Sequence, residues 1–96
     1  MIVVEVTQSG ISITGHAGYA EPGKDIVCAA VSVLAQNLIM SLDAFTNDLG
    51  AYNIEPGRIT LEYKNLSEKG VLLVDSFFIG ICQIQGAYGS QYVQVQ

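Results

Sequence analysis

Apolar and polar residues alternate at the start of the chain. Residues 2–7 (IVVEVT) and 11–15 (ISITG) change character at about every second position, the period of a strand with one buried face. Gln8, Ser9 and Gly10 lie between the two segments and are typical of a tight turn. The pattern therefore predicts a β-hairpin, followed by a loop over residues 16–25, which contain two Gly and one Pro.

The period of the apolar residues lengthens after Asp25. Spacings of three and four predict an amphipathic helix of about 20 residues that closes between Asn47 and Gly50. Its expected stripe consists of Ile26, Val27, Ala30, Val31, Leu34, Leu38, Leu42 and Phe45. Asp25 places a side-chain acceptor just before this stripe, so it is the expected N-cap.

The remaining chain predicts a strand, a second helix and a last strand. Residues 58–64 (RITLEYK) alternate cleanly, and residues 92–95 alternate again as an expected edge strand. Residues 70–81 could also form a strand, because Val, Phe and Ile are frequent there. A helix is preferred, since Asp75 and Ser76 then fall on one side. The second stripe consists of Val71, Val74, Phe78, Ile81 and Tyr88, widened by Leu72, Ile79 and Cys82.

These elements predict one α+β domain that spans residues 1–96. The expected order is β-β-α-β-α-β, with two packed helices on a small mixed sheet. The sequence contains no internal repeat and no linker.

The composition is unusually apolar. Half of the residues are hydrophobic and 14% are charged, against about 25% charged in an average domain. The apolar runs 26–35 and 71–82 are interrupted before the roughly 18 residues of a membrane span, and no signal peptide is evident. We therefore expect a cytoplasmic protein with reduced thiols and no membrane contact. The surplus apolar residues favour a homodimer.

The charge balance restricts the partners. Four Lys and Arg face nine Asp and Glu, for a net charge of −5. Binding to nucleic acid is not expected, because that affinity comes from Lys and Arg that displace counterions from phosphates. A basic protein or peptide fits the negative field better.

The scarce reactive residues restrict the chemistry. The only His is His16 and the only Cys residues are Cys28 and Cys82, so neither a disulfide framework nor a CxxC zinc site can form, and no metal site is expected. Cys28 falls in the first turn of the predicted helix, where free N–H groups and the helix dipole favour a thiolate and can stabilise an oxyanion. His16, at the end of the second strand, could accept the Cys28 proton and return it to a leaving amine. Cys82 is expected to fill the core.

Each candidate also has a purely structural explanation. Cys28 can be a small buried hydrophobe and His16 a polar strand end. Asp25 can orient the imidazole or only cap the helix. Ser32, one turn after Cys28, can reach the thiol or be an ordinary helix residue, and Tyr19 can line a substrate groove or rest on the surface. Residue types and spacing leave these alternatives open.

One motif adds a specific resemblance. Residues 15–19 (GHAGY) and 23–34 (GKDIVCAAVSVL) form the pattern G-H-A, a short Gly-containing loop, then D-I-V-C-A-A-V-S. This pattern resembles the ribosomal-processing cysteine protease family, Prp, and the similarity extends over essentially the whole chain, more weakly beyond Gly50.

The resemblance implies a homodimeric α+β cysteine protease. Cys28 would be the nucleophile and His16 the general base and acid, with Asp25 and Ser32 at the accompanying polar positions. The loop over residues 17–24, which begins with Ala17, Gly18 and Tyr19, would close over the substrate. No cofactor or metal is implied.

The resemblance also implies a substrate. The family removes a short N-terminal extension from a large-subunit ribosomal protein near the peptidyl-transferase centre, and such a basic protein suits the charge of this chain. Two other interpretations remain open from the residues alone. One is a non-catalytic, ribosome-associated protein-binding module, and the other is a thiol redox sensor in which Cys82 resolves Cys28.

Overall fold

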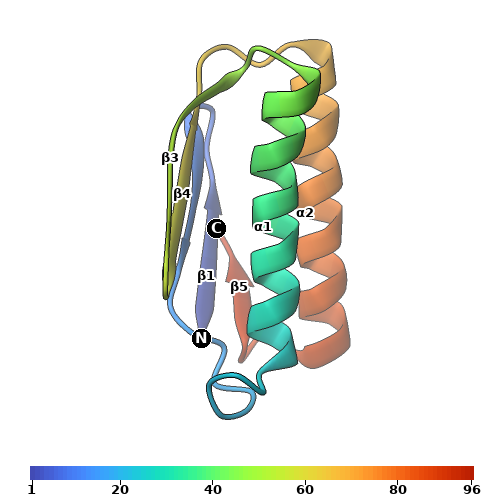
Figure 1. Cartoon of the computed structure of the whole chain (residues 1–96). Coiled ribbons are helices and arrows are strands. Elements are labelled where there is room, and N and C mark those ends of the chain that lie inside the picture. The colour runs from blue at the N-terminus through green and yellow to red at the C-terminus, as the bar shows by residue number, and fades with distance from the viewer.

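One layer of β-sheet and one layer of two antiparallel helices make up the chain (Figure 1). The computed structural model describes all residues, 1–96. In chain order the elements are β1 (Ile2–Val6), β2 (Gly10–Thr14), α1 (Ile26–Phe45), β3 (Leu49–Glu55), β4 (Arg58–Tyr63), α2 (Glu68–Tyr88) and β5 (Val93–Val95). The predicted α+β class is confirmed.

The sheet is mixed, as the sequence predicted. Its strand order is β3-β4-β2-β1-β5; β1 and β5 are parallel, and all other neighbours are antiparallel. Val4 pairs with Ile13, which in turn pairs with Ile59. All three side chains are buried under the helices, so the alternation seen in the sequence marks the face that carries the core.

The expected element order was wrong in one respect, because it lacked β3. The observed order is β-β-α-β-β-α-β. β3 lies at the sheet edge and pairs only with β4, and its register shifts between Leu49 and Tyr52. Its last five residues are all exposed, so no buried face leaves an alternating pattern in the sequence.

The long helix α1 packs on the sheet through a stripe close to the expected one. Its buried residues are Val27, Val31, Ala35, Leu38, Ile39 and Leu42. Ile26 and Phe45, the two ends of the expected stripe, are 52% and 65% exposed. They are the first and last residues of the helix, and the core lies against the turns between them.

The second apolar segment forms a helix, α2, and the strand alternative is wrong. The helix continues through Gly80. A Cβ at this position would lie only 2.8 Å from the Leu34 side chain of α1. The missing side chain therefore lets the two helices approach closely. Cys82 is exposed, which corrects its expected place in the core. It follows the buried Ile81 and so points about 100° away around the helix.

Both helices retain exposed apolar residues. By length and composition alone, each is long and apolar enough to cross a membrane, although the sequence runs had appeared too short. A core helix can have the same composition, and α1 and α2 bury 33% and 22% of their most apolar windows. The apolar residues are thus divided between the core and an outer surface.

A buried carboxylate fixes the start of α2. Asp48, which is 6% exposed, accepts hydrogen bonds from Ser67 N at 2.9 Å and Ser67 Oγ at 2.7 Å. Ser67 is also the N-cap of α2 and accepts from Gly70 N at 3.2 Å. The backbone of Gly70 packs so closely on Asp48 that a Cβ there would collide with Oδ2.

We expect Gly70→Ala to lower the free energy of unfolding by about 1–3 kcal/mol, because the new methyl group must displace a buried, hydrogen-bonded carboxylate. Gly86→Ala is the matched control, because it lies in the same helix and its Cβ would meet nothing within 4 Å. It should leave stability unchanged or raise it by up to about 1 kcal/mol. Urea unfolding of both variants gives the comparison, and equal stabilities would contradict the assigned role of Asp48.

Candidate active site

Asp25 caps α1, as the sequence predicted, and thereby places Cys28 in the first helical turn. Its Oδ1 accepts hydrogen bonds from Val27 N and Cys28 N, both at 3.0 Å. The cap holds the helix start rigidly, so the Cys28 side chain has a defined direction. Cys28 itself is half-buried.

The second oxygen of Asp25 binds the loop that precedes the helix. Oδ2 accepts from Tyr19 N at 2.9 Å and from Ala20 N at 3.3 Å. Burial alone would raise the pKa of this carboxyl, but the four backbone donors outweigh burial and hold its pKa below the usual 3.8. Both oxygens are occupied by the backbone, and Asp25 makes no hydrogen bond to His16.

His16 follows β2 and rests on the tip of the β3–β4 hairpin. Gly15, with φ +92°, turns the chain out of the strand, and its N–H donates to Gly57 O at 2.9 Å. Gly57, with φ +74°, lies directly beside the imidazole, because a Cβ there would be 2.8 Å from His16 Nε2. The hairpin tip therefore supports the ring in the space that a side chain at residue 57 would fill.

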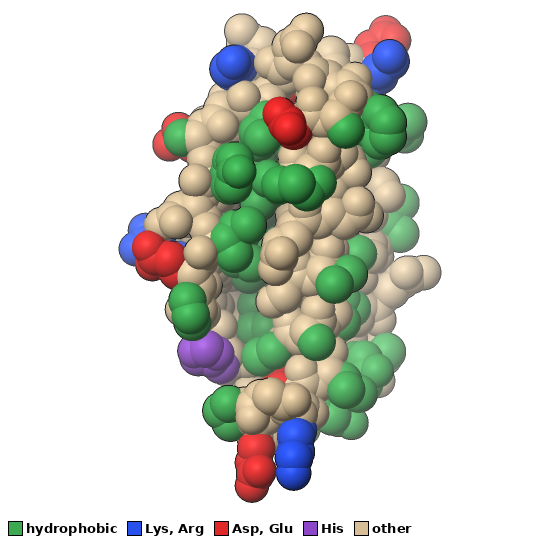
Figure 2. Space-filling view, in the orientation of Figure 1, with side chains coloured by type: hydrophobic (Ala, Val, Ile, Leu, Met, Phe, Trp, Pro, Cys, Tyr) green, Lys and Arg blue, Asp and Glu red, His purple; other side chains and the backbone are tan.

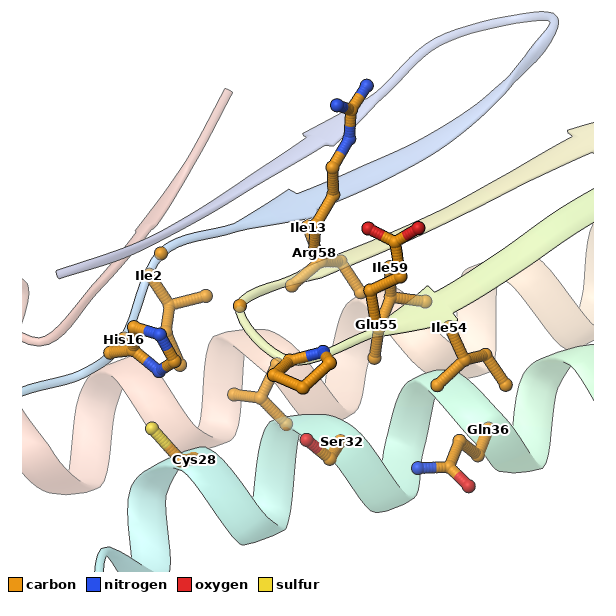
Figure 3. Close-up of a pocket in the computed structure, with 14 residues that line it drawn as sticks. Ile2, Ile13, His16, Cys28, Ser32, Gln36, Ile54, Glu55, Arg58 and Ile59 are labelled. Atoms are coloured by element: carbon orange, nitrogen blue, oxygen red, sulfur yellow. The ribbon is translucent and has the colours of Figure 1, made fainter. Parts of the chain in front are cut away.

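The Cys28 sulfur and the His16 ring point toward one another across the space between α1 and the end of β2 (Figure 3). The hydrogen bond that the sulfur accepts comes from the backbone of Ala17, with a distance of 3.2 Å from N to Sγ. A backbone N–H that donates to sulfur favours negative charge on that atom. A thiol, an imidazole and a backbone donor thus lie close together.

Two pockets adjoin at this point. A pocket of about 330 Å³ lies on the side of the hairpin, and one of about 560 Å³ lies on the side of the loop. His16, Cys28 and Ser32 line both of them. These side chains therefore lie at the boundary between two hollows.

The other predicted residues divide into two groups. Gly18 and Asp25 line the pocket on the loop side, and Ala17 bonds the sulfur. Tyr19 lines neither pocket, and its ring packs instead against Tyr88 at the end of α2 and Tyr92 just before β5, so the structure does not place it in a groove.

Sequence reasoning missed one wall of the site. Gln36 and the hairpin residues 54–59 line the smaller pocket. The hairpin was overlooked together with β3, although Pro56 and Gly57 form a dipeptide that marks turns. Gln36 lies one turn beyond Ser32, so continuing the Cys28–Ser32 spacing along the helix would have found it.

Removing the negative charge of Asp25 tests its bonds to the backbone. Asp25→Asn should destabilise the fold by about 1 kcal/mol or more at neutral pH, because an amide cannot accept through both of its atoms. Since the folded pKa lies below 3.8, this stabilisation is complete above that pH and disappears as the pH falls through the lower folded value.

Urea unfolding against pH is the measurement, and Asp43→Asn, an exposed change on α1, is the control. The difference in the free energy of unfolding between Asp25→Asn and the parent should shrink to zero as the solution is acidified. If this difference in the free energy of unfolding stays constant down to the lowest pH at which the parent folds, the ionised Asp25 carboxylate does not stabilise the fold through these hydrogen bonds.

Known proteins are similar to this chain in sequence and in fold. Over 32 residues the chain is 53% identical to the ribosomal processing cysteine protease Prp of Mycoplasma genitalium; this segment is 33% of the chain and 32% of that relative. A crystal structure from Streptococcus mutans is 28% identical, with a TM-score of 0.79 over 100% of this chain and 92% of that one.

A further structure resembles the fold even more closely. The ribosomal processing protease Prp of Staphylococcus aureus, in complex with a covalently linked product peptide, gives a TM-score of 0.90 at 20% identity, over 100% of this chain and 98% of that one. The sequence model of the family described as cysteine protease Prp matches residues 1–94. The chain therefore belongs to the Prp family of cysteine proteases.

Proposed function

We propose that this chain is a cytoplasmic cysteine endopeptidase that removes the N-terminal extension of a basic large-subunit ribosomal protein. Cys28 is its nucleophile and His16 its general base and acid. The observation that carries the proposal is the meeting of Cys28, His16 and the Ala17 N–H at the boundary of two pockets. This is the arrangement that acyl transfer through a thiolate requires.

The reaction follows from the side chains present. His16 takes the proton of the Cys28 thiol, and the sulfur attacks the scissile carbonyl carbon to form a tetrahedral oxyanion. When that intermediate collapses, the C–N bond breaks and His16 gives its proton to the leaving amine. A water molecule, deprotonated by His16, then attacks the thioester carbonyl, and the released sulfur regains the proton.

Two pockets on either side of the sulfur favour an endopeptidase. A substrate that crosses Cys28 can place the residues before the scissile bond in one pocket and those after it in the other. An extended N-terminal tail satisfies this geometry without unfolding of the substrate. The net charge of −5 favours the approach of a basic protein.

The relatives support the substrate class. The Mycoplasma genitalium relative is named for ribosomal processing, and two Staphylococcus aureus structures hold a product peptide and a substrate peptide. A ribosomal protein tail is therefore the first substrate to test.

A peptide that spans the extension and the start of the mature ribosomal protein tests the proposal. The parent should cleave it once, Cys28→Ser should abolish cleavage, and His16→Ala should lower kcat by about 10²–10⁴-fold, the usual contribution of a general base. Mass spectrometry of the products identifies the bond that is cut.

Cys82→Ser is the matched control, because the second thiol is exposed and lies in neither pocket. It should cleave as the parent does. Binding of the peptide by all variants without cleavage would overturn the protease and favour a ribosome-associated binding module.

A second copy of the chain is the proposed cover for the apolar outer surface. Val33 of α1 and Leu72 of α2 are 67% and 69% exposed, and Met40 and Ile79 are also largely exposed. Figure 2 shows hydrophobic side chains along the side of the molecule formed by α2. Large exposed apolar areas of this kind mark protein interfaces, and identical copies are the commonest partners.

We expect light scattering to give twice the chain mass of 10.3 kDa at micromolar concentration. Val33→Glu and Ile79→Glu should shift the protein toward the monomer, because each places a charge in an apolar interface. Ala51→Glu on the exposed edge strand is the control and should leave the mass unchanged. A parent that is monomeric throughout would contradict the homodimer.

A further inference from the structure

Three tyrosines meet at the end of the molecule that carries the active-site loop. The ring of Tyr19 makes T-shaped contacts with Tyr88, at 5.4 Å between ring centroids, and with Tyr92, at 5.2 Å. Tyr19 lies in the loop between β2 and α1, whereas Tyr88 ends α2 and Tyr92 directly precedes β5. The C-terminal part of the chain thus holds the loop through aromatic contacts.

The two tyrosines that receive Tyr19 belong to a well-fixed part of the fold. The carbonyl oxygen of Tyr92 accepts a hydrogen bond from Ile2 N at 2.8 Å, which ties it to β1. Tyr92 N donates to Gly89 O at 3.2 Å, and Gly89, with φ +115°, turns the chain back from α2 toward the sheet. Tyr88 and Tyr92 therefore form a rigid seat for a loop that has no regular structure of its own.

The loop is held from two sides close to the reactive sulfur. The backbone N–H of Tyr19 is bound by Asp25, and the Tyr19 ring lies in the tyrosine seat. Two residues earlier, Ala17 is only 3% exposed and donates its N–H to Cys28 Sγ. With both the backbone and the ring of Tyr19 fixed, little freedom is left for the Ala17 N–H.

We propose that Tyr88 and Tyr92 are positioning residues, which hold the Ala17 N–H on the Cys28 sulfur by seating Tyr19. Neither tyrosine lines the two pockets at Cys28, so neither touches the reacting atoms. They act through Tyr19 and the loop backbone. The inference rests on the proposed function, because it assigns these residues to the reactivity of the same nucleophile.

The expected effect has a definite direction and size. The Ala17 N–H stabilises the thiolate. If Tyr19 loses its contacts with Tyr88 and Tyr92, the loop can move and the Cys28 sulfur loses this hydrogen bond. An aromatic pair of this geometry contributes enough for each lost contact to lower reactivity by roughly 2- to 10-fold. The hairpin-side pocket keeps its walls, whereas the loop itself lines the larger pocket, so we expect a change in KM beside the loss in kcat, and the rate of alkylation by a small reagent isolates the loss at the sulfur.

The experiment compares Tyr88→Leu, Tyr92→Leu and the double variant with Tyr88→Phe and Tyr92→Phe. All carry Cys82→Ser, so that iodoacetamide reacts with Cys28 alone. The rate of alkylation at a fixed neutral pH and the kcat and KM for the extension peptide are measured on proteins shown to be folded by urea unfolding. Phe45→Leu, an exposed aromatic change at the far end of α1, is the control.

The Leu variants should slow both alkylation and kcat, and the Phe variants, which keep the rings, should restore both. Parental rates in a folded double Leu variant, or faster alkylation, would overturn the proposal; the latter would mean that the loop shields the thiol. If the parent cuts no peptide, the proposed function fails, while the alkylation rates still decide the role of the tyrosines.

Discussion

Four backbone N–H groups converge on the Asp25 carboxylate, and the active site depends on this one cluster of hydrogen bonds. One oxygen holds the first turn of α1, which carries Cys28, and the other holds the loop that carries Ala17. Cys28 and the backbone donor to its sulfur are thereby fixed to a common point. Burying a carboxylate without hydrogen-bond donors would destabilise the folded state. The backbone N–H groups of the loop and of the helix start supply the hydrogen bonds that Asp25 needs.

The sheet supplies the other half of the site. β2 ends at Thr14, and the next residue, Gly15, donates its N–H to Gly57 of the β3–β4 hairpin, which also supports the His16 ring. The helix layer thus presents the sulfur and the sheet layer presents the imidazole, as Figure 3 shows. Packing of α1 on the sheet, through residues such as Val27 and Val31, sets the separation of the two groups.

The parts of this site that follow from the sequence are those built by local chemistry. Asp25 as the cap, Cys28 in the first turn and His16 after a strand all follow from period and residue type. β3 could not be predicted from the sequence, because an exposed edge strand leaves no alternating pattern of buried residues. The support of the His16 ring by Gly57 could not be predicted either, because Gly57 acts by lacking a side chain. The contacts that Tyr19 makes with Tyr88 and Tyr92, which are distant in sequence, leave no periodic signal, although Tyr88 itself belongs to the expected stripe of the second helix.

A chain of 96 residues has few places from which to build a catalytic centre, and the solution here uses both ends of it. The reactive groups come from one short stretch, residues 16–28, whose loop cannot order itself by periodic hydrogen bonding. Its order is supplied by one carboxylate within the stretch and by two aromatic rings, one at the end of α2 and one just before β5. Because β5 pairs with β1, the last strand anchors Tyr92 at the edge of the sheet, where its ring packs against Tyr19 of the loop.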